Sequence, residues 1–189
     1  MSGNKGCGSS LAILVGVILL ILAVAGVRGC NNLVHKMGVG TVEEQLIIVQ
    51  NFEEKVNELD KEADGLNKKV SKELLKIADY EMPDLELIEK AEKTNNSLSI
   101  RMEDIEIPKG LTKEREEKLT EIKADFAQMY KFKSNAMFYY SLAFEDSDPE
   151  MLQSFKANTD VAYNIMLSAT TDLELLKKEL GFSQDEAKS

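Results

Sequence analysis

Residues 150–180 read EMLQSFKANTDVAYNIMLSATTDLELLKKEL, and this stretch decides the fold class of the chain. Its core positions recur at alternating steps of three and four residues, at Leu152, Phe155, Thr159, Ala162, Met166, Ala169, Leu173, Leu176 and Leu180. Such spacing places every member on one face of an α-helix, because a helical turn takes about 3.6 residues. The stretch therefore predicts one long amphipathic helix that buries a single stripe.

Three further stretches carry the same period, so four helices are expected, over about 42–80, 84–106, 112–145 and 149–180. The three prolines stand only at the joints between these helices, and no stretch between residues 42 and 182 alternates with period two. Long amphipathic helices with short connections favour antiparallel neighbours. We expect an all-α fold, in which residues 42–182 form an elongated antiparallel up-down four-helix bundle with coiled-coil-like packing and residues 183–189 form a disordered tail.

A different kind of segment precedes the bundle. Residues 9–27 read SSLAILVGVILLILAVAGV and contain no charged side chain. At about 1.5 Å per residue such a helix reaches roughly 28 Å, close to the ~30 Å hydrocarbon core of a bilayer. We therefore expect a single transmembrane signal-anchor helix, with a short N-terminal tail over 1–8 and a flexible connector over 28–41.

The orientation and processing of this anchor follow from its flanks. Basic residues on its two sides nearly balance, but a short N-terminal tail before a large C-terminal domain is typical of a signal anchor that places the domain outside the cytoplasm. Two processed forms stay open. An Ala-x-Ala site ends at Ala25, and a sequence that resembles a bacterial lipobox ends at Cys30, although Arg28 departs from that pattern. Cys30 is therefore the candidate for lipidation.

The charge of the expected bundle limits its partners. All 33 acidic residues lie beyond Lys36, but only 20 of the 23 basic ones do, which leaves a formal charge of 20 − 33 = −13. Such a surface repels nucleic acids and anionic lipid headgroups. We expect no nucleic-acid partner, and proteins or cations remain the candidate ligands.

The sequence holds no recognisable catalytic or cofactor motif. His35 is the only histidine and lies in the connector, so no multi-histidine metal or catalytic cluster can form within one chain. A glycine-rich phosphate loop, an HExxH motif and a C-x-x-C pair are all missing from the sequence. We expect no enzymatic activity, no cofactor and no metal.

Aromatic residues cluster on the third expected helix, which carries seven of the twelve in the chain. On a helical wheel Phe132, Tyr139 and Phe138 lie away from the core face of that helix. Two interpretations remain open. A helix buried on two sides would hide these rings inside the bundle, whereas a helix at the surface would offer them as a docking surface for another protein. Tyr163 and Leu167 form a smaller flank of the same kind on the fourth helix.

These observations favour a membrane-anchored, non-catalytic scaffold or adaptor. The bundle would offer a helical face to an unidentified protein partner or to a second copy of the chain at the membrane surface. The alternative hypothesis is an extracytoplasmic sensing or solute-binding bundle, whose acidic surface captures a cation or a small cationic ligand.

Overall fold

The computed structural model describes residues 38–76, 82–146, 148 and 150–183. The predicted membrane segment over 9–27, the lipidation candidate Cys30 and most of the predicted tail lie outside these residues. Within the described part of the chain, no helix is both long and apolar enough to cross a membrane. The chain divides into two units, Met1–Thr41 and Val42–Ser189, and all four described helices belong to the second.

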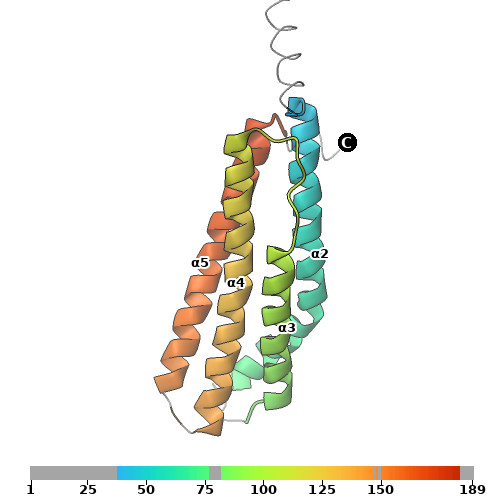
Figure 1. Ribbon diagram of the computed structural model, residues 1–189. Coiled ribbons are helices and arrows are strands. Elements are labelled where there is room, and N and C mark those ends of the chain that lie inside the picture. The colour runs from blue at the N-terminus through green and yellow to red at the C-terminus, as the bar shows by residue number, and fades with distance from the viewer. Residues whose placement is uncertain (1–37, 77–81, 147, 149, 184–189) are drawn as a thin grey trace, which may run out of the picture. The chain divides into compact units, whose positions relative to one another are not determined.

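Four α-helices make up the described part of this unit: α2 (Val42–Leu75), α3 (Leu85–Glu103), α4 (Lys113–Glu145) and α5 (Glu150–Glu179). Successive helices run in opposite directions and lie side by side, with α4 packed between α3 and α5 (Figure 1). The described residues form no strand, and their β contacts consist of one isolated bridge between Lys109 and Leu111. The expected helical bundle is thereby confirmed.

The helix ends follow local chemistry. Asp84 caps α3 by accepting a hydrogen bond from the Leu87 amide at 3.1 Å, and Thr112 caps α4 in the same way through the Arg115 amide at 3.4 Å. After α5, Gly181 adopts a φ of 85°, and the Phe182 amide reaches back to the Lys177 carbonyl at 3.0 Å. This is a Schellman cap, which glycine favours because it carries no Cβ.

The chain between α3 and α4 differs from the expectation. Periodicity predicts that the second helix continues to Glu106, but α3 ends at Glu103 and residues 104–112 are largely extended. Pro108 disfavours the helical state in the residue before it, and Ile105 and Ile107 both pack against the core in the extended chain. The Lys123 ammonium satisfies two of the freed carbonyl groups by donating hydrogen bonds to Glu103 and Ile105.

Two hydrophobic clusters form the core. The larger cluster lies at the end that holds the start of α2 and draws buried residues from all four helices. Its members are Val49, Phe52, Val56, Leu59, Ala63, Leu98, Met102, Leu111, Leu119, Ile122, Phe126, Ala127, Met129, Tyr130, Ala162, Ala169, Leu173, Leu176 and Leu180. The smaller cluster consists of Val70, Ile88, Ala91, Ala136, Met137 and Tyr140, and α5 adds only the partly buried Leu152 and Phe155 to it.

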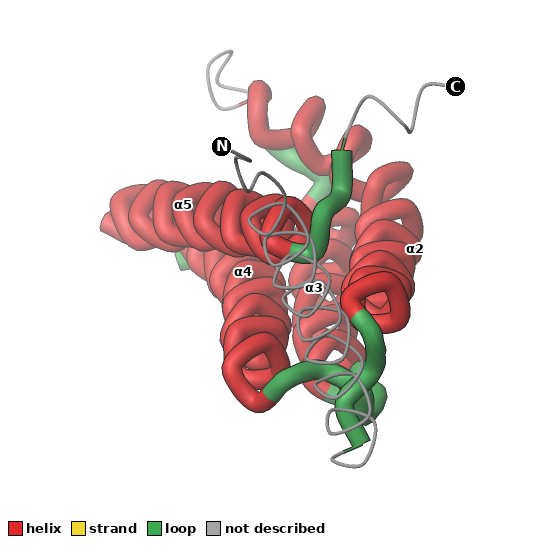
Figure 2. The backbone as a smooth tube through the Cα atoms, turned by 90° about the horizontal axis from the view of Figure 1, so that it is seen from above, coloured by secondary structure: helices red, strands yellow, loops and turns green. Residues whose placement is uncertain are grey.

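Helix α5 is inclined to α2, so that its N-terminal end lies away from α2 (Figures 1 and 2). Residues 150–161 contain no buried side chain. At the other end of α5, Lys177 is only 4% exposed and lies 2.8 Å from Glu53 of α2 and 2.8 Å from Glu174. Burial alone would lower the pKa of Lys177, but the hydrogen bonds that its ammonium donates to Glu174 and Glu53 outweigh burial and raise the pKa.

Candidate interaction surface

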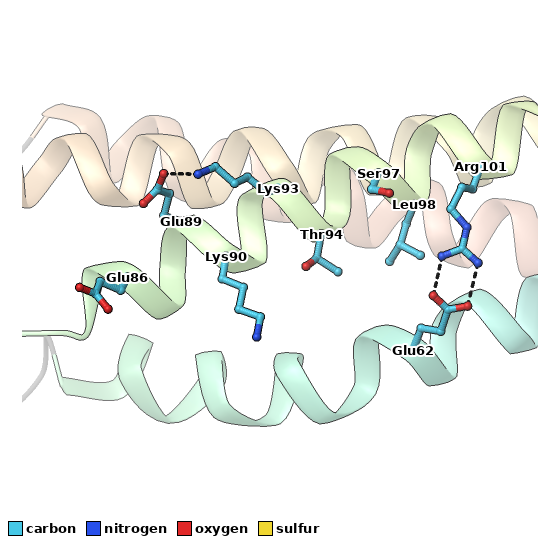
Figure 3. A pocket seen from close by; sticks show the side chains of 9 residues that line it. All are labelled: Glu62, Glu86, Glu89, Lys90, Lys93, Thr94, Ser97, Leu98 and Arg101. Atoms are coloured by element: carbon cyan, nitrogen blue, oxygen red, sulfur yellow. Dashed lines mark hydrogen bonds and ion pairs between the residues drawn. The ribbon is translucent and has the colours of Figure 1, made fainter.

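Two grooves between helices are the first candidates for a site. One, of about 560 Å³, lies along α3 on the side of α2 (Figure 3). It is lined by Glu62, Glu86, Glu89, Lys90, Lys93, Thr94, Ser97, Leu98 and Arg101. Three carboxylates and three basic groups therefore balance one another around a floor that contains the buried Leu98.

Ion pairs occupy much of this α2–α3 groove. Arg101 donates two hydrogen bonds to Glu62, one of them at 2.7 Å, and Lys93 pairs with Glu89 (Figure 3). The hydrogen bond from Arg101 holds the pKa of Glu62 below its ordinary range. Because Glu62 and Arg101 are about half exposed, water screens the pair and its contribution to stability is small. The groove between α2 and α3 is therefore lined by solvent-exposed ion pairs.

The second groove, of about 240 Å³, lies between α4 and α5 and has a different character. It is lined by Lys118, Glu121, Ile122, Asp125, Asp172, Leu175, Leu176 and Glu179. Four carboxylates thus face one ammonium group across an apolar floor. Lys118 is paired with Glu179 at 3.0 Å. Burial raises the pKa of Asp125, and the nearby charges of Asp172 and Glu121 raise it further.

The pairing of α4 with α5 shows how this groove continues. Lys118 lies against Glu179, and seven residues further along α4 Asp125 lies near Asp172, seven residues earlier on α5. The same antiparallel register brings Phe132 to the level of Ile165. Residues seven apart differ by only about 20° around a helix, so Asp125, Phe132 and Tyr139 share one face of α4. Two of the predicted docking residues therefore lie on the face that borders the α4–α5 groove.

The structure places the three predicted docking residues at different depths. Phe132 is partly buried and packs against the larger cluster. Tyr139 is also partly buried, whereas Phe138 is 44% exposed. The rings of Phe138 and Tyr139 form an edge-to-face pair with centroids 5.6 Å apart. Of these three residues Phe138 therefore offers the most exposed aromatic surface, and the docking role of all three stays a prediction.

Helix α5 contributes apolar residues that the aromatic pattern of α4 does not reveal. Val161 is 38% exposed and Leu175 is 50% exposed, and with Ser168 between them they form a stripe of seven-residue spacing. The sequence could have identified Val161 and Leu175, because both are apolar residues that fall outside the core stripe of α5. Tyr163 and Leu167, at 56% and 47%, are also exposed, as their off-stripe positions predict, and lie on the opposite flank of α5.

A group of polar side chains links α2 and α4 at the edge of the core. The Tyr130 hydroxyl, completely buried, donates a hydrogen bond to Asp60, and burial, reinforced by Asp60, raises the pKa of this phenol. The Lys133 ammonium lies 5.2 Å from the centre of the Tyr130 ring, and burial lowers its pKa. None of these three residues lines either groove, so their contacts explain packing rather than chemistry on a ligand.

A metal ion would be a further candidate ligand for the described side chains. Among the described residues, no group of three or more His, Cys, Asp or Glu side chains could hold a metal ion. Comparisons of the chain with protein-family models, with curated proteins and with solved structures give no match. The grooves and the exposed residues around them are therefore the candidate functional features of the described part of the chain.

Proposed function

We propose that this protein is a membrane-anchored, non-catalytic adaptor whose helical bundle binds another protein through the outer face of α4 and α5. One observation carries the proposal: Leu175 of α5 remains half exposed at a groove that already has an apolar floor, and Val161 is a further exposed apolar residue on the same side of α5. Leu175 at 50% exposed and Val161 at 38% would lose water on binding, which is the main favourable contribution in most protein associations.

The membrane anchor is the second part of this proposal. It is supported by the uncharged run over residues 9–27. We propose that this run crosses the bilayer once, leaves the C-terminal bundle outside the cytoplasm, and keeps the bundle near the membrane surface. Full-length protein should then stay with the membrane fraction after alkaline extraction, and protease added to intact cells should release peptides of the bundle. Recovery of the intact chain in the aqueous fraction would contradict the anchor.

Site-specific photocrosslinking tests the adaptor role. A benzophenone amino acid at Leu175 reports on the proposed face, and one at Ile100 on α3 is the matched control because the two residues are 50% and 51% exposed. We expect one defined protein adduct from position 175 in native membranes and none of the same mass from position 100. The purified adduct partner should then bind the full chain, and Leu175→Glu should weaken that binding while Ile100→Glu does not. Equal adducts from both positions would exclude a dedicated face.

A small cationic ligand is the second candidate function, and the four carboxylates of the α4–α5 groove favour it. A ligand that binds only the folded state raises the melting temperature of the protein. We expect spermidine, a small organic cation, to raise it if this function is correct, and the effect should disappear in Asp125→Asn. An unchanged melting temperature at millimolar ligand would dismiss this candidate.

A further inference from the structure

The chemistry of the partner can be inferred from the same face, and this inference rests on the adaptor role proposed above. We infer that the α4–α5 groove binds a basic amphipathic helix of a partner protein. A lysine or arginine of that helix would enter between Asp125 and Asp172, and its apolar side would cover Leu175 and Val161.

The apolar half of the groove sets the first requirement. Ile122 and Leu176 are buried in the floor, and Leu175 stands half exposed beside them. Phe132, seven residues beyond Asp125 on the same face of α4, continues this apolar surface. A small hydrophilic cation would leave the exposed part of Leu175 in water. An amphipathic helix would cover this surface and remove it from water.

The charged half sets the second requirement. The charge of Asp172 lies close enough to Asp125 to disfavour the charged form of Asp125, and Glu121 adds a further negative charge beside it. The one lysine that lines the groove, Lys118, is already paired with Glu179. A guanidinium or ammonium group placed between the two aspartates would relieve this repulsion, and guanidinium matches carboxylates with two parallel hydrogen bonds.

The length of the face suits a short helix. Asp125 to Tyr139 on α4 and Val161 to Leu175 on α5 each span fourteen steps, which at 1.5 Å per residue is about 21 Å. Four turns of a partner helix would cover this length.

Charge also argues against two other occupants. A second copy of the chain, docked through the same face, would bring four more carboxylates against the four already present. Anionic lipid headgroups meet the same repulsion, because the chain beyond Lys36 has a formal charge of −13. A basic helix is the occupant that complements both the apolar stripe and the charge.

The test uses the full chain in phosphatidylcholine nanodiscs and a fluorescent helical peptide of about 18 residues, with leucine on one side and arginine on the other. A peptide of the same composition in scrambled order is the control for amphipathic character. The double variant Asp125→Asn with Asp172→Asn removes two charges from the groove. The double variant Glu54→Gln with Glu58→Gln removes two charges from the exposed side of α2 and is the matched control.

We expect the amphipathic peptide to bind the wild-type chain and the α2 control equally, and to bind the Asp125 and Asp172 variant about tenfold more weakly or worse. Leu175→Ser should weaken binding as well, with the circular dichroism spectrum unchanged in every variant. Equal weakening by both double variants would show diffuse attraction to an acidic surface and would overturn the inference. Equal binding of the scrambled peptide, or full competition by spermidine, would overturn it too.

Failure of this inference can be told apart from failure of the adaptor role. If position 175 crosslinks a defined partner in native membranes but the arginine peptide does not bind, the adaptor role stands and the partner is not a basic helix. If position 175 yields no protein adduct beyond that of position 100, the adaptor role itself is wrong, whatever the peptide does.

Discussion

Helix α5 is packed more tightly at one end of the bundle than at the other. Around the larger cluster, α5 contributes fully buried residues such as Ala169 and Leu176, and Lys177 ties it to α2. Around the smaller cluster its contribution is limited to partly buried side chains, because its N-terminal end lies away from α2 (Figure 2). All four helices pack around the larger cluster. Around the smaller cluster three helices pack tightly and α5 packs loosely. The stability of the fold should therefore come mainly from the larger cluster.

The largest expected effect compares one substitution in the two clusters. Leu176→Ala removes a side chain that is 1% exposed, and we expect the free energy of unfolding to fall by about 3 kcal/mol. Leu152→Ala removes a partly buried side chain from the same helix, so a loss of about 1 kcal/mol is expected. Urea unfolding of both variants measures the difference. Equal losses would mean that the two ends hold α5 equally well.

The next effect concerns the ion pairs between α5 and α2. Lys177→Met leaves the carboxylates of Glu53 and Glu174 without the ammonium between them, and a loss of about 2 kcal/mol is expected because both are partly exposed. The folded-state pKa of Lys177 is raised, so the wild-type advantage is complete below the ordinary pKa of about 10.5 and disappears as pH rises through the folded value. Thermal unfolding from pH 7 to pH 11 checks this. An advantage that persists unchanged at pH 11 would refute the ion-pair explanation.

A smaller effect, of opposite sign, is expected between the clusters. Lys133→Met replaces a partly buried ammonium by an apolar chain of similar length, and we expect a gain of about 1 kcal/mol at neutral pH. The folded-state pKa of Lys133 is lowered, so its charge destabilises the fold below that pKa, and the gain should shrink as pH rises towards about 10.5. Lys55→Met, at an exposed position on α2, is the control. A loss of stability in Lys133→Met would show that its contact with Tyr130 matters more than its burial.

The smallest effect lies in the α4–α5 groove. The folded-state pKa of Asp125 is raised, so its charge destabilises the fold above that pKa and has no effect well below the ordinary value of 3.8. Asp125→Asn should raise the melting temperature by about 1 °C at pH 7 and leave it unchanged at pH 2.5, since such substitutions stay within about 0.5 kcal/mol. Differential scanning calorimetry can resolve this. A lower melting temperature at pH 7 would mean that Asp125 makes a favourable contact.

Most of the helical architecture could be predicted from the sequence, because it follows from apolar period and from chain breakers. The stripe from Ala162 to Leu180 predicts the buried face of the C-terminal part of α5, and the glycine after it predicts the observed cap. The N-terminal part of the same stripe was predicted wrongly, since Thr159 is exposed and Leu152 and Phe155 are only partly buried. The early end of α3 could not be read from period alone. Ile105 falls on the helical stripe, but it also packs against the core from extended chain, where Pro108 favours the second geometry.

The candidate site was only partly accessible to sequence reasoning. The aromatic pattern identifies Phe132 and Tyr139, which share a face with Asp125. The role of Asp125 itself depends on Asp172, 47 residues away, and on the register between α4 and α5. Helical period determines which face of each helix is buried, but it does not determine which residues of two helices meet across a groove. Likewise the inclination of α5 depends on tertiary packing and not on its own regular stripe.

The last turn of α5 has a mechanical consequence. The carbonyl of Lys177 accepts the capping hydrogen bond from Phe182, while the ammonium of the same residue binds Glu53 near the start of α2. A force that pulls on the chain beyond Phe182 therefore acts on a residue that is also tied to Glu53 of α2. A processive protease that engages the C-terminus would have to break this link before it could peel α5 from the bundle.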